Sequence, residues 1–417
     1  MTVYRPRMVD PEIDEILAAG GAVSLEGARA CGKSATGRHH AASSIQLDRD
    51  PQALRLAELD PARLLTGAQP RFIDEWQLAP AVWNQVRAAV DDDPESAYLL
   101  AGSALPADDI TRHSGSGRIL RLRMRPMSLA ESGDSTAAVS LRALFDRPGD
   151  PVSGESKLTV GDLAGRAAEG GWPGLLRLSS NRTTARLTSY LDDVARTDIP
   201  RLDREPARNP DGIRRVLRSL GRVTATEASI ASIARDAAGD VPLAAETVAN
   251  YLAALERVFV VEDQPSWGPH LRSRDRVRQA PKRHFVDPSL AVAAVGANAG
   301  RLLTDLEYFG QVFESLVVRD LRVYSQSIDA VIRHYRDSAG HEVDAIVERR
   351  DGSWIACEVK LAAAREDDAA AALHRFVDVL DLARTRPPTT LMIVTGGRYA
   401  YTRPDGIHVV PIGVLGA

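Results

Sequence analysis

The chain has 417 residues, with 52 Lys+Arg, 56 Asp+Glu and a formal net charge of −4, so its overall charge gives no general attraction to nucleic acid or membranes. Its length predicts two or three domains of about 100–200 residues each, and its 44% hydrophobic and 26% charged residues exclude a disordered chain. The two cysteines exclude a disulfide framework, and the absence of a signal peptide and of an apolar run of about 18 residues leads us to expect a cytoplasmic protein without a membrane partner.

Short apolar runs alternate with helical stretches along residues 1–146. We expect strands at Ala22–Glu26, Ser44–Asp48, Arg71–Asp74, Tyr98–Ala101 and Ile119–Leu122, and helices at Lys33–Ala42, Ala53–Leu65 and Ala81–Val90. This alternation predicts an α/β domain over residues 1–146, with a parallel sheet that helices cover on both faces.

The segment Gly27–Ser34 lies between the first strand and the first helix and fits the phosphate-binding loop pattern G-x-x-x-x-G-K-[ST]. Lys33 would bridge the β- and γ-phosphates of ATP, and the Ser34 hydroxyl would bind Mg²⁺. A glycine-containing turn of an unrelated fold is the alternative. Only four of the 52 basic residues are lysine, so a chance lysine at a chosen position has a probability of about one in a hundred. We therefore expect ATP to contact Gly27, Ala28, Arg29, Ala30, Cys31, Gly32, Lys33, Ser34 and Ala35.

Two acidic residues, Asp74 and Glu75, end the strand that begins at Arg71. Asp74 would support Mg²⁺, and Glu75 would polarise the water that attacks the γ-phosphate. Such a pair also caps helices in many proteins. Together with the phosphate loop, however, it forms a good second half of one nucleotide site.

A hydroxyl and several arginines follow this pair. Ser103 ends the next strand and would sense the γ-phosphate, as a polar residue on the neighbouring strand does in AAA-type ATPases, or would cap the following helix. Five arginines and no acid lie between Ile110 and Ala130, namely Arg112, Arg118, Arg121, Arg123 and Arg125. We favour Arg118 as an arginine finger, acting in cis or from a neighbouring subunit of a homo-oligomer. Solvent-facing arginines are the alternative.

A linker rich in Pro, Gly and Ser, Arg147–Ser156, precedes a mostly helical domain over residues 157–295. Helices at Ser229–Ala238 and Ala244–Phe259 are typical of a helix-turn-helix, and His270–His284 holds six Lys/Arg and one acid. This basic stretch would form a wing that contacts DNA. The second helix is apolar and acidic, so a purely structural role is an equal alternative.

The last domain, over residues 300–417, is predicted to be α/β. We expect helices at Tyr308–Tyr324 and Asp367–Leu382, and strands at Ala330–Tyr335, Val343–Glu348, Trp354–Lys360 and Thr390–Val394.

This domain contains three acidic residues and a lysine in the order E…D…E-x-K, namely Glu314, Asp344, Glu358 and Lys360. Strand alternation places Glu358 and Lys360 on one face, and Asp344 lies on a neighbouring strand. With Glu314 and the Val359 carbonyl, these carboxylates would bind Mg²⁺ or Mn²⁺, and Lys360 would activate a metal-bound water for phosphodiester hydrolysis. A salt bridge of Lys360 with Asp344 or Glu358 is the alternative.

These residues resemble a family, the prokaryotic AAA-type ATPases that join a P-loop domain to a C-terminal restriction-endonuclease-like domain of unknown function. The matching pieces include EGARACGKS, FIDEWQ, LLAGS, GGWP, APKRHFVD, HEVDAIV and ACEVK, and they run nearly end to end. The resemblance implies Mg-ATP at Gly27, Gly32, Lys33, Ser34 and Asp74, and a PD-(D/E)xK-like site at Glu314, Asp344, Glu358 and Lys360. The family's loop more often has Pro-Arg-Gln where this chain has Ala28–Ala30, and Thr where it has Ser34.

Two functions of different classes follow from these motifs. The first is an Mg²⁺-dependent ATPase whose nucleotide state controls a nuclease that acts on nucleic acid, with DNA favoured. The second is an ATP-switched module that binds DNA or a protein without cutting, in defence or toxin–antitoxin-type regulation.

Overall fold

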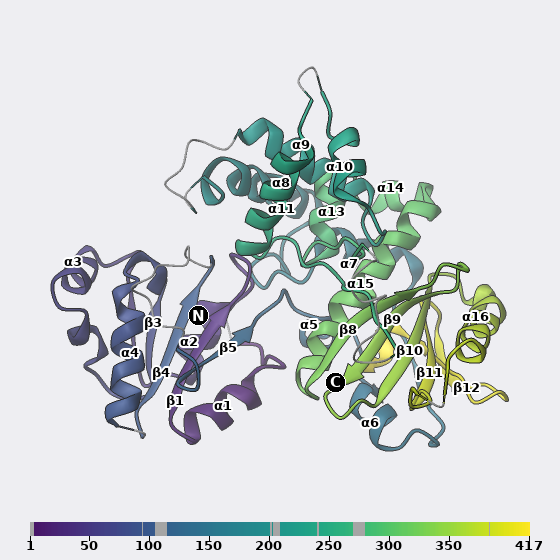
Figure 1. The fold of residues 1–417 in the computed structure, drawn as a ribbon, viewed down its shortest axis with the longest axis horizontal. Helices are drawn as coiled ribbons and strands as arrows, with labels where there is room; N and C mark the ends of the chain where they lie inside the picture. The colour runs from purple at the N-terminus through teal and green to yellow at the C-terminus, as the bar shows by residue number, and fades with distance from the viewer. Residues whose placement is uncertain are drawn as a thin grey trace. The chain divides into compact units, whose positions relative to one another are not determined.

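The computed structural model describes residues 4–93, 95–104, 115–200, 202, 209–239, 242–269, 280–382 and 384–417. The chain forms two compact units (Figure 1). The first unit consists of Met1–Pro126, Thr197–Ala207 and Ala253–Val260, and the second consists of Met127–Arg196, Arg208–Leu252 and Val261–Ala417. Among the helices of the described ranges, none is long and apolar enough to cross a membrane.

The first unit is built on a five-stranded parallel sheet, as the sequence predicts. Its strands are β1 (Gly21–Glu26), β2 (Ser43–Gln46), β3 (Arg71–Asp74), β4 (Ala97–Gly102) and β5 (Ile119–Arg123), in the order β2-β3-β4-β1-β5. Every neighbouring pair is parallel. The carboxyl ends of all five strands therefore meet at one edge of the sheet.

Two hydrophobic cores cover the two faces of this sheet. One core contains Leu100 and Ile73 together with Trp83 of α4 (Ala81–Asp92). The other contains Val23 and Leu99, with Ile13 of α1 (Asp10–Ala18). Burial on both faces explains why these strands appear in the sequence as continuous apolar runs.

The helices of the first unit differ from prediction in two respects: α1 was not predicted, and the helix predicted at Ala53–Leu65 is divided. Helix α2 (Lys33–His40) follows β1 as expected. The single helix predicted at Ala53–Leu65 is instead α3 (Pro51–Leu59) and a short 3-10 helix, Pro61–Leu65. Pro61 has no backbone N–H to donate to the preceding turn, so the α-helix ends before it.

The second unit holds the helical segment that follows the first sheet. Its helices are α5 (Leu129–Ser132), α6 (Leu141–Asp146), α7 (Val160–Glu169), α8 (Ser180–Asp193), α9 (Pro210–Arg222), α10 (Ile230–Asp236), α11 (Ala245–Arg257), α13 (Pro288–Ala294) and α14 (Ala299–Thr304), with a π-helical turn at Val194–Asp198. The last residues of α11 and the last two of the π-helical turn, Thr197 and Asp198, are grouped with the first unit. Helices α10 and α11 lie at the two positions predicted for a helix-turn-helix. Their assignment to a winged-helix domain stays a prediction.

A seven-stranded mixed sheet forms the rest of the second unit. It contains β7 (Gly154–Glu155), β8 (Ala330–Arg336), β9 (Glu342–Arg349), β10 (Trp354–Lys360), β11 (Thr390–Thr395), β12 (Tyr399–Thr402) and β13 (His408–Pro411), in the order β7-β12-β13-β11-β10-β9-β8. Helix α15 (Leu306–Gln326) contacts β8, β9 and β10, and α16 (Glu366–Asp378) contacts β9, β10 and β11. A cluster of aromatic side chains, Trp267, Tyr335, Trp354 and Phe376, packs in its core.

The first segment of the first compact unit ends at Pro126, before the predicted domain boundary at residue 146. Two short strands, β6 (Val139–Ser140) and β7, pair with β14 (Leu415–Gly416) and β12 respectively. The segment Arg147–Ser156, predicted as a linker, therefore contributes a strand to the C-terminal sheet. Residues 127–156 belong to the second unit.

The described end of the predicted basic wing is buried. Gln264 forms an antiparallel bridge with Lys282, and Ser266 forms a parallel bridge with His334 of β8. Lys282, Arg283 and His284 are 2%, 7% and 2% exposed. These three residues therefore do not form a solvent-facing wing. Residues 270–279 of the predicted wing lie outside the described residues.

Candidate functional site

The phosphate loop has the backbone that the motif requires. It follows β1 and leads directly into α2, and Gly32 has a φ of 114° in the left-handed region. The Lys33 side chain folds back over the loop, where its Nζ donates hydrogen bonds to the carbonyl oxygens of Gly27 at 2.7 Å and Ala28 at 2.9 Å. The loop thus holds a buried ammonium where a phosphate would bind.

The loop is held in place by residues that the motif does not include. A Cβ on Gly27 would lie 2.0 Å from the backbone oxygen of Met124, so only glycine fits there. Arg7 is buried and donates to the carbonyl oxygens of Cys31 at 2.9 Å and Arg125 at 2.7 Å. The sequence analysis missed Arg7, because no local pattern marks a residue that precedes the motif by twenty positions.

The acidic pair lies at the same edge of the sheet as the loop. Asp74 is buried at the end of β3 and accepts a hydrogen bond from Gln46 Nε2 at 3.0 Å, while Arg38 Nη1 lies 3.9 Å away. Glu75 has a φ of 56° and accepts a hydrogen bond from Gln77. Burial raises the pKa of Glu75, although the Gln77 bond and the Lys33 charge oppose that rise. A raised pKa suits a carboxylate that takes a proton from water.

The position of β4 places Ser103 between the two halves of the nucleotide site. β4 lies between β1 and β3, and Ser103 directly follows its carboxyl end. The loop, Ser103 and Asp74 therefore follow three adjacent strands at one sheet edge. This arrangement agrees with the predicted role of Ser103 at the γ-phosphate, which stays a prediction.

Arg118 lies at the opposite edge of this sheet. It immediately precedes β5, whose first residue, Ile119, is in register with Ala22 at the start of β1. Its guanidinium pairs with Asp91, at 2.6 Å between Nε and Oδ1. A strand of six residues separates this edge from the loop, a distance of roughly 17–20 Å. Arg118 thus cannot act in cis in this arrangement, and a role from a neighbouring subunit stays a prediction.

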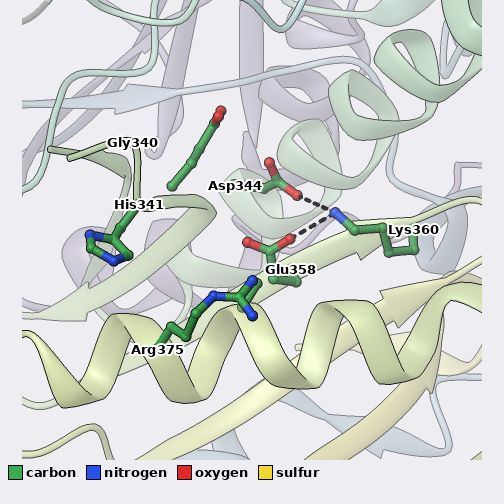
Figure 2. A pocket seen from close by; sticks show the side chains of 8 residues that line it. Gly340, His341, Asp344, Glu358, Lys360 and Arg375 are labelled. Carbon is green, nitrogen blue, oxygen red and sulfur yellow. Dashed lines mark hydrogen bonds and ion pairs between the residues drawn. The ribbon is translucent and has the colours of Figure 1, made fainter. Parts of the chain in front are cut away.

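The predicted acidic residues of the C-terminal domain come together. Lys360 Nζ lies 2.7 Å from Glu358 Oε2 and 3.6 Å from Asp344 Oδ2. Asp344 Oδ2 also accepts a hydrogen bond from the Val359 backbone N–H at 2.9 Å. These side chains line a cavity of about 270 Å³, into which Arg375 of α16 also points (Figure 2). The role of the Val359 carbonyl as a metal ligand stays a prediction.

Glu314 joins this group through a second lysine that the sequence analysis assigned to the wing. The Lys282 Nζ lies 2.7 Å from Glu314 Oε1, 3.0 Å from Glu342 Oε1 and 3.1 Å from Asp344 Oδ1. We call these six side chains, Lys282, Glu314, Glu342, Asp344, Glu358 and Lys360, the acid–lysine cluster.

This arrangement of the cluster does not fit a metal ion. Asp344 uses one carboxylate oxygen for Lys282 and the other for Val359 and Lys360. No three His, Cys, Asp or Glu side chains of the described segments are placed to hold a metal ion together. The Lys282 ammonium stands where the carboxylates of Glu314 and Asp344 converge.

Burial and mutual repulsion set the charges in the cluster. Burial and the charge of Asp344 raise the pKa of Glu314 to about 8 and that of Glu358 to about 8. Burial also acts against the charged form of Asp344, but the ammonium groups of Lys282 and Lys360 hold its pKa below the usual value. Asp344 thus has both ammonium groups close by, with Lys282 Nζ at 3.1 Å and Lys360 Nζ at 3.6 Å.

Comparisons with known proteins agree with the N-terminal part of this description. An AAA domain model matches residues 20–133, Domain of unknown function (DUF8612) matches residues 161–301, and Domain of unknown function (DUF4143) matches residues 309–415. No curated protein sequence matches the chain. The N-terminal part of the chain therefore carries an AAA-type ATPase domain.

Two solved structures of ATPases resemble the chain distantly. AMPPCP-bound DnaA from Aquifex aeolicus has 13% identity and a TM-score of 0.25, with 60% of this chain and 86% of that chain covered. The Signal Transduction ATPase with Numerous Domains protein PH0952 from Pyrococcus horikoshii has 11% identity and a TM-score of 0.26, with 79% and 50% covered.

Proposed function

We propose that this chain, which carries an AAA domain over residues 20–133, is an Mg²⁺-dependent ATPase whose nucleotide state controls a C-terminal domain acting on nucleic acid. The observation that carries the proposal is the carboxyl edge of the first sheet. There a phosphate loop, an acidic pair and a hydroxyl follow three adjacent parallel strands. This is the set of groups that phosphoryl transfer needs, held by one rigid element.

Each residue of this edge has a specific task in the proposal. The Lys33 ammonium leaves the loop carbonyls and binds the β- and γ-phosphates of ATP. The Ser34 hydroxyl and the Asp74 carboxylate are oxygen donors of the kind that Mg²⁺ prefers, and the ion would neutralise charge on the phosphates. Glu75 orients the attacking water and accepts its proton.

The test of this site compares two substitutions that should fail at different steps. Lys33→Ala should lose ATP binding, because it removes the only ammonium at the loop. Glu75→Gln should keep ATP binding but lose turnover. Lys157→Ala, at an exposed lysine in another segment, is the control. ATP turnover at the wild-type rate in either site variant would show that the assignment is wrong.

We further propose that the acid–lysine cluster acts on phosphodiesters, with DNA favoured. Support comes from Asp344, Glu358 and Lys360, which line one cavity at β9 and β10, and from Glu314 of α15, which shares the Lys282 ammonium with Asp344. The test is incubation of the protein with Mg²⁺ or Mn²⁺ and DNA or RNA. Cleavage that persists in Asp344→Ala and Lys360→Ala would identify a contaminant or another site.

A second candidate function is an ATP-switched module that binds nucleic acid without cutting it. The position of Lys282 favours this candidate, because its ammonium stands among the carboxylates that a metal-dependent nuclease would use. Retention of DNA without cleavage, together with ATP binding without turnover, would support it over the first candidate. An arginine finger in trans would require a homo-oligomer, which the mass of the ATP-bound protein in solution would reveal.

A further inference from the structure

We propose that the Lys282 ammonium is a built-in counter-ion that competes with a divalent metal ion for Glu314 and Asp344. The inference rests on the proposed role of the acid–lysine cluster in phosphodiester cleavage. In the conformation described here the lysine excludes the metal, and the metal binds only when the lysine side chain moves away. The cluster is then a site whose metal content depends on the position of one side chain.

The geometry around Lys282 is that of a fully satisfied cation. An ammonium has three N–H donors, and three carboxylate oxygens lie within 3.1 Å of this one, from Glu314, Glu342 and Asp344. The side chain is 2% exposed. A divalent ion would need the same oxygens at about 2.0–2.6 Å. The ion and the ammonium therefore cannot occupy the cluster together.

Two hydrogen bonds hold the backbone of Lys282, so the proposed exchange involves its side chain. Its N–H donates to the Gln264 carbonyl at 3.0 Å, and its carbonyl accepts from the Gln264 N–H at 2.9 Å. The Gln264 side-chain amide donates to the backbone carbonyls of Asp344 and Arg333, each at 2.9 Å. One glutamine thus anchors both the segment that carries the lysine and β9, the strand that carries its partner Asp344.

Glu342 gives the displaced ammonium a place to go. Its side chain is 40% exposed and lines the cavity, whereas those of Glu314 and Asp344 are 14% and 11% exposed. Lys282 already contacts Glu342 at 3.0 Å, so it can keep this partner while it leaves the two buried carboxylates. Exchange of the ammonium for a metal ion then needs no main-chain opening and leaves no buried charge unpaired.

Metal binding to the nucleotide-free full chain tests the competition directly. Free Mn²⁺ is followed by electron paramagnetic resonance in the wild type, Lys282→Met, Lys157→Met and the double variant Lys282→Met/Asp344→Asn. We expect Lys282→Met to bind one Mn²⁺ at least tenfold more tightly than the wild type, because the competing cation is gone. Lys157→Met should match the wild type. The double variant should lose the tight site, since Asp344 supplies it.

Equal Mn²⁺ affinity in the wild type and Lys282→Met would overturn the proposal, as would a tight site that persists in the double variant. If Lys282→Met does not fold without metal, its melting temperature in the presence of Mn²⁺ tests the competition instead. Recovery of the fold with Mn²⁺ supports the competition, and no recovery overturns it. A variant that binds Mn²⁺ tightly but cleaves neither DNA nor RNA would refute the proposed cleavage function and leave the competition intact.

Discussion

Gly27→Ala tests the structural account of the nucleotide site, because the contact that forbids a side chain there is with backbone. The added Cβ would lie 2.0 Å from the Met124 carbonyl oxygen and 3.0 Å from its carbonyl carbon. Ordinary contacts begin at 3.4 Å, so the phosphate loop and the segment after β5 must separate by about 1.4 Å. Rotamer changes cannot relieve an overlap with main-chain atoms.

This separation should weaken ATP binding by a calculable amount. Hydrogen bonds span about 2.7–3.2 Å, so a shift of this size removes a backbone N–H from contact with a phosphate. One hydrogen bond to a charged group contributes about 1.5–3 kcal/mol, which corresponds to a roughly 10- to 150-fold loss of affinity. Overpacking also destabilises the first unit by about 1–3 kcal/mol.

Isothermal titration of ATP into the purified variant measures the loss of affinity, and thermal melting without nucleotide measures the loss of stability. Gly149→Ala is the matched control, because a Cβ there meets no atom within 4 Å. Wild-type ATP affinity in Gly27→Ala, within a factor of three, would refute the packing argument for the loop.

Three further predictions concern stability. Arg319→Leu should destabilise the chain by about 3–5 kcal/mol in urea titrations, because the buried carboxylates of Asp287 and Asp320 lose their shared cation at 3.0 and 2.6 Å; an unchanged midpoint would contradict this. Trp267→Ala should lower the free energy of unfolding by about 3–5 kcal/mol in the same assay. The Trp267 ring packs against Tyr335, Trp354 and Phe376 in the C-terminal core, so its removal leaves a cavity there. Hydrogen bonds to Asp10 and Asp14 raise the pKa of His40, so its contribution to stability is complete below pH 6.5 and is lost as the pH rises through the raised value. The melting temperature of the wild type should fall as the pH rises above 6.5, and that of His40→Gln should lack this part of the fall. Identical pH profiles of the two proteins would contradict this role of His40.

Much of the first unit could be predicted from local sequence, for a physical reason. Its strands are buried on both faces, so each appears as a short apolar run, and the phosphate loop is a contiguous motif between two elements. The strands β6, β7 and β14 were missed because two residues show no periodicity. The segment Arg147–Ser156 has the composition of a linker, but composition does not reveal that Gly154 and Glu155 pair with β12.

The sequence prediction for Lys282 as part of a solvent-facing wing was wrong, because this lysine is buried. A run of basic residues suggested a surface wing, but the partners that bury Lys282 are separated from it by 18 to 62 positions in the sequence. The scarcity of lysine, used to support Lys33 and Lys360, applied equally to Lys282. Three of the four lysines lie in the two candidate sites, and Lys157 is exposed. A compact ammonium fits among three carboxylate oxygens where a planar guanidinium does not. Lys282→Arg should therefore disrupt the acid–lysine cluster although it preserves the charge, because the fit depends on the shape of the cation as well as on its sign.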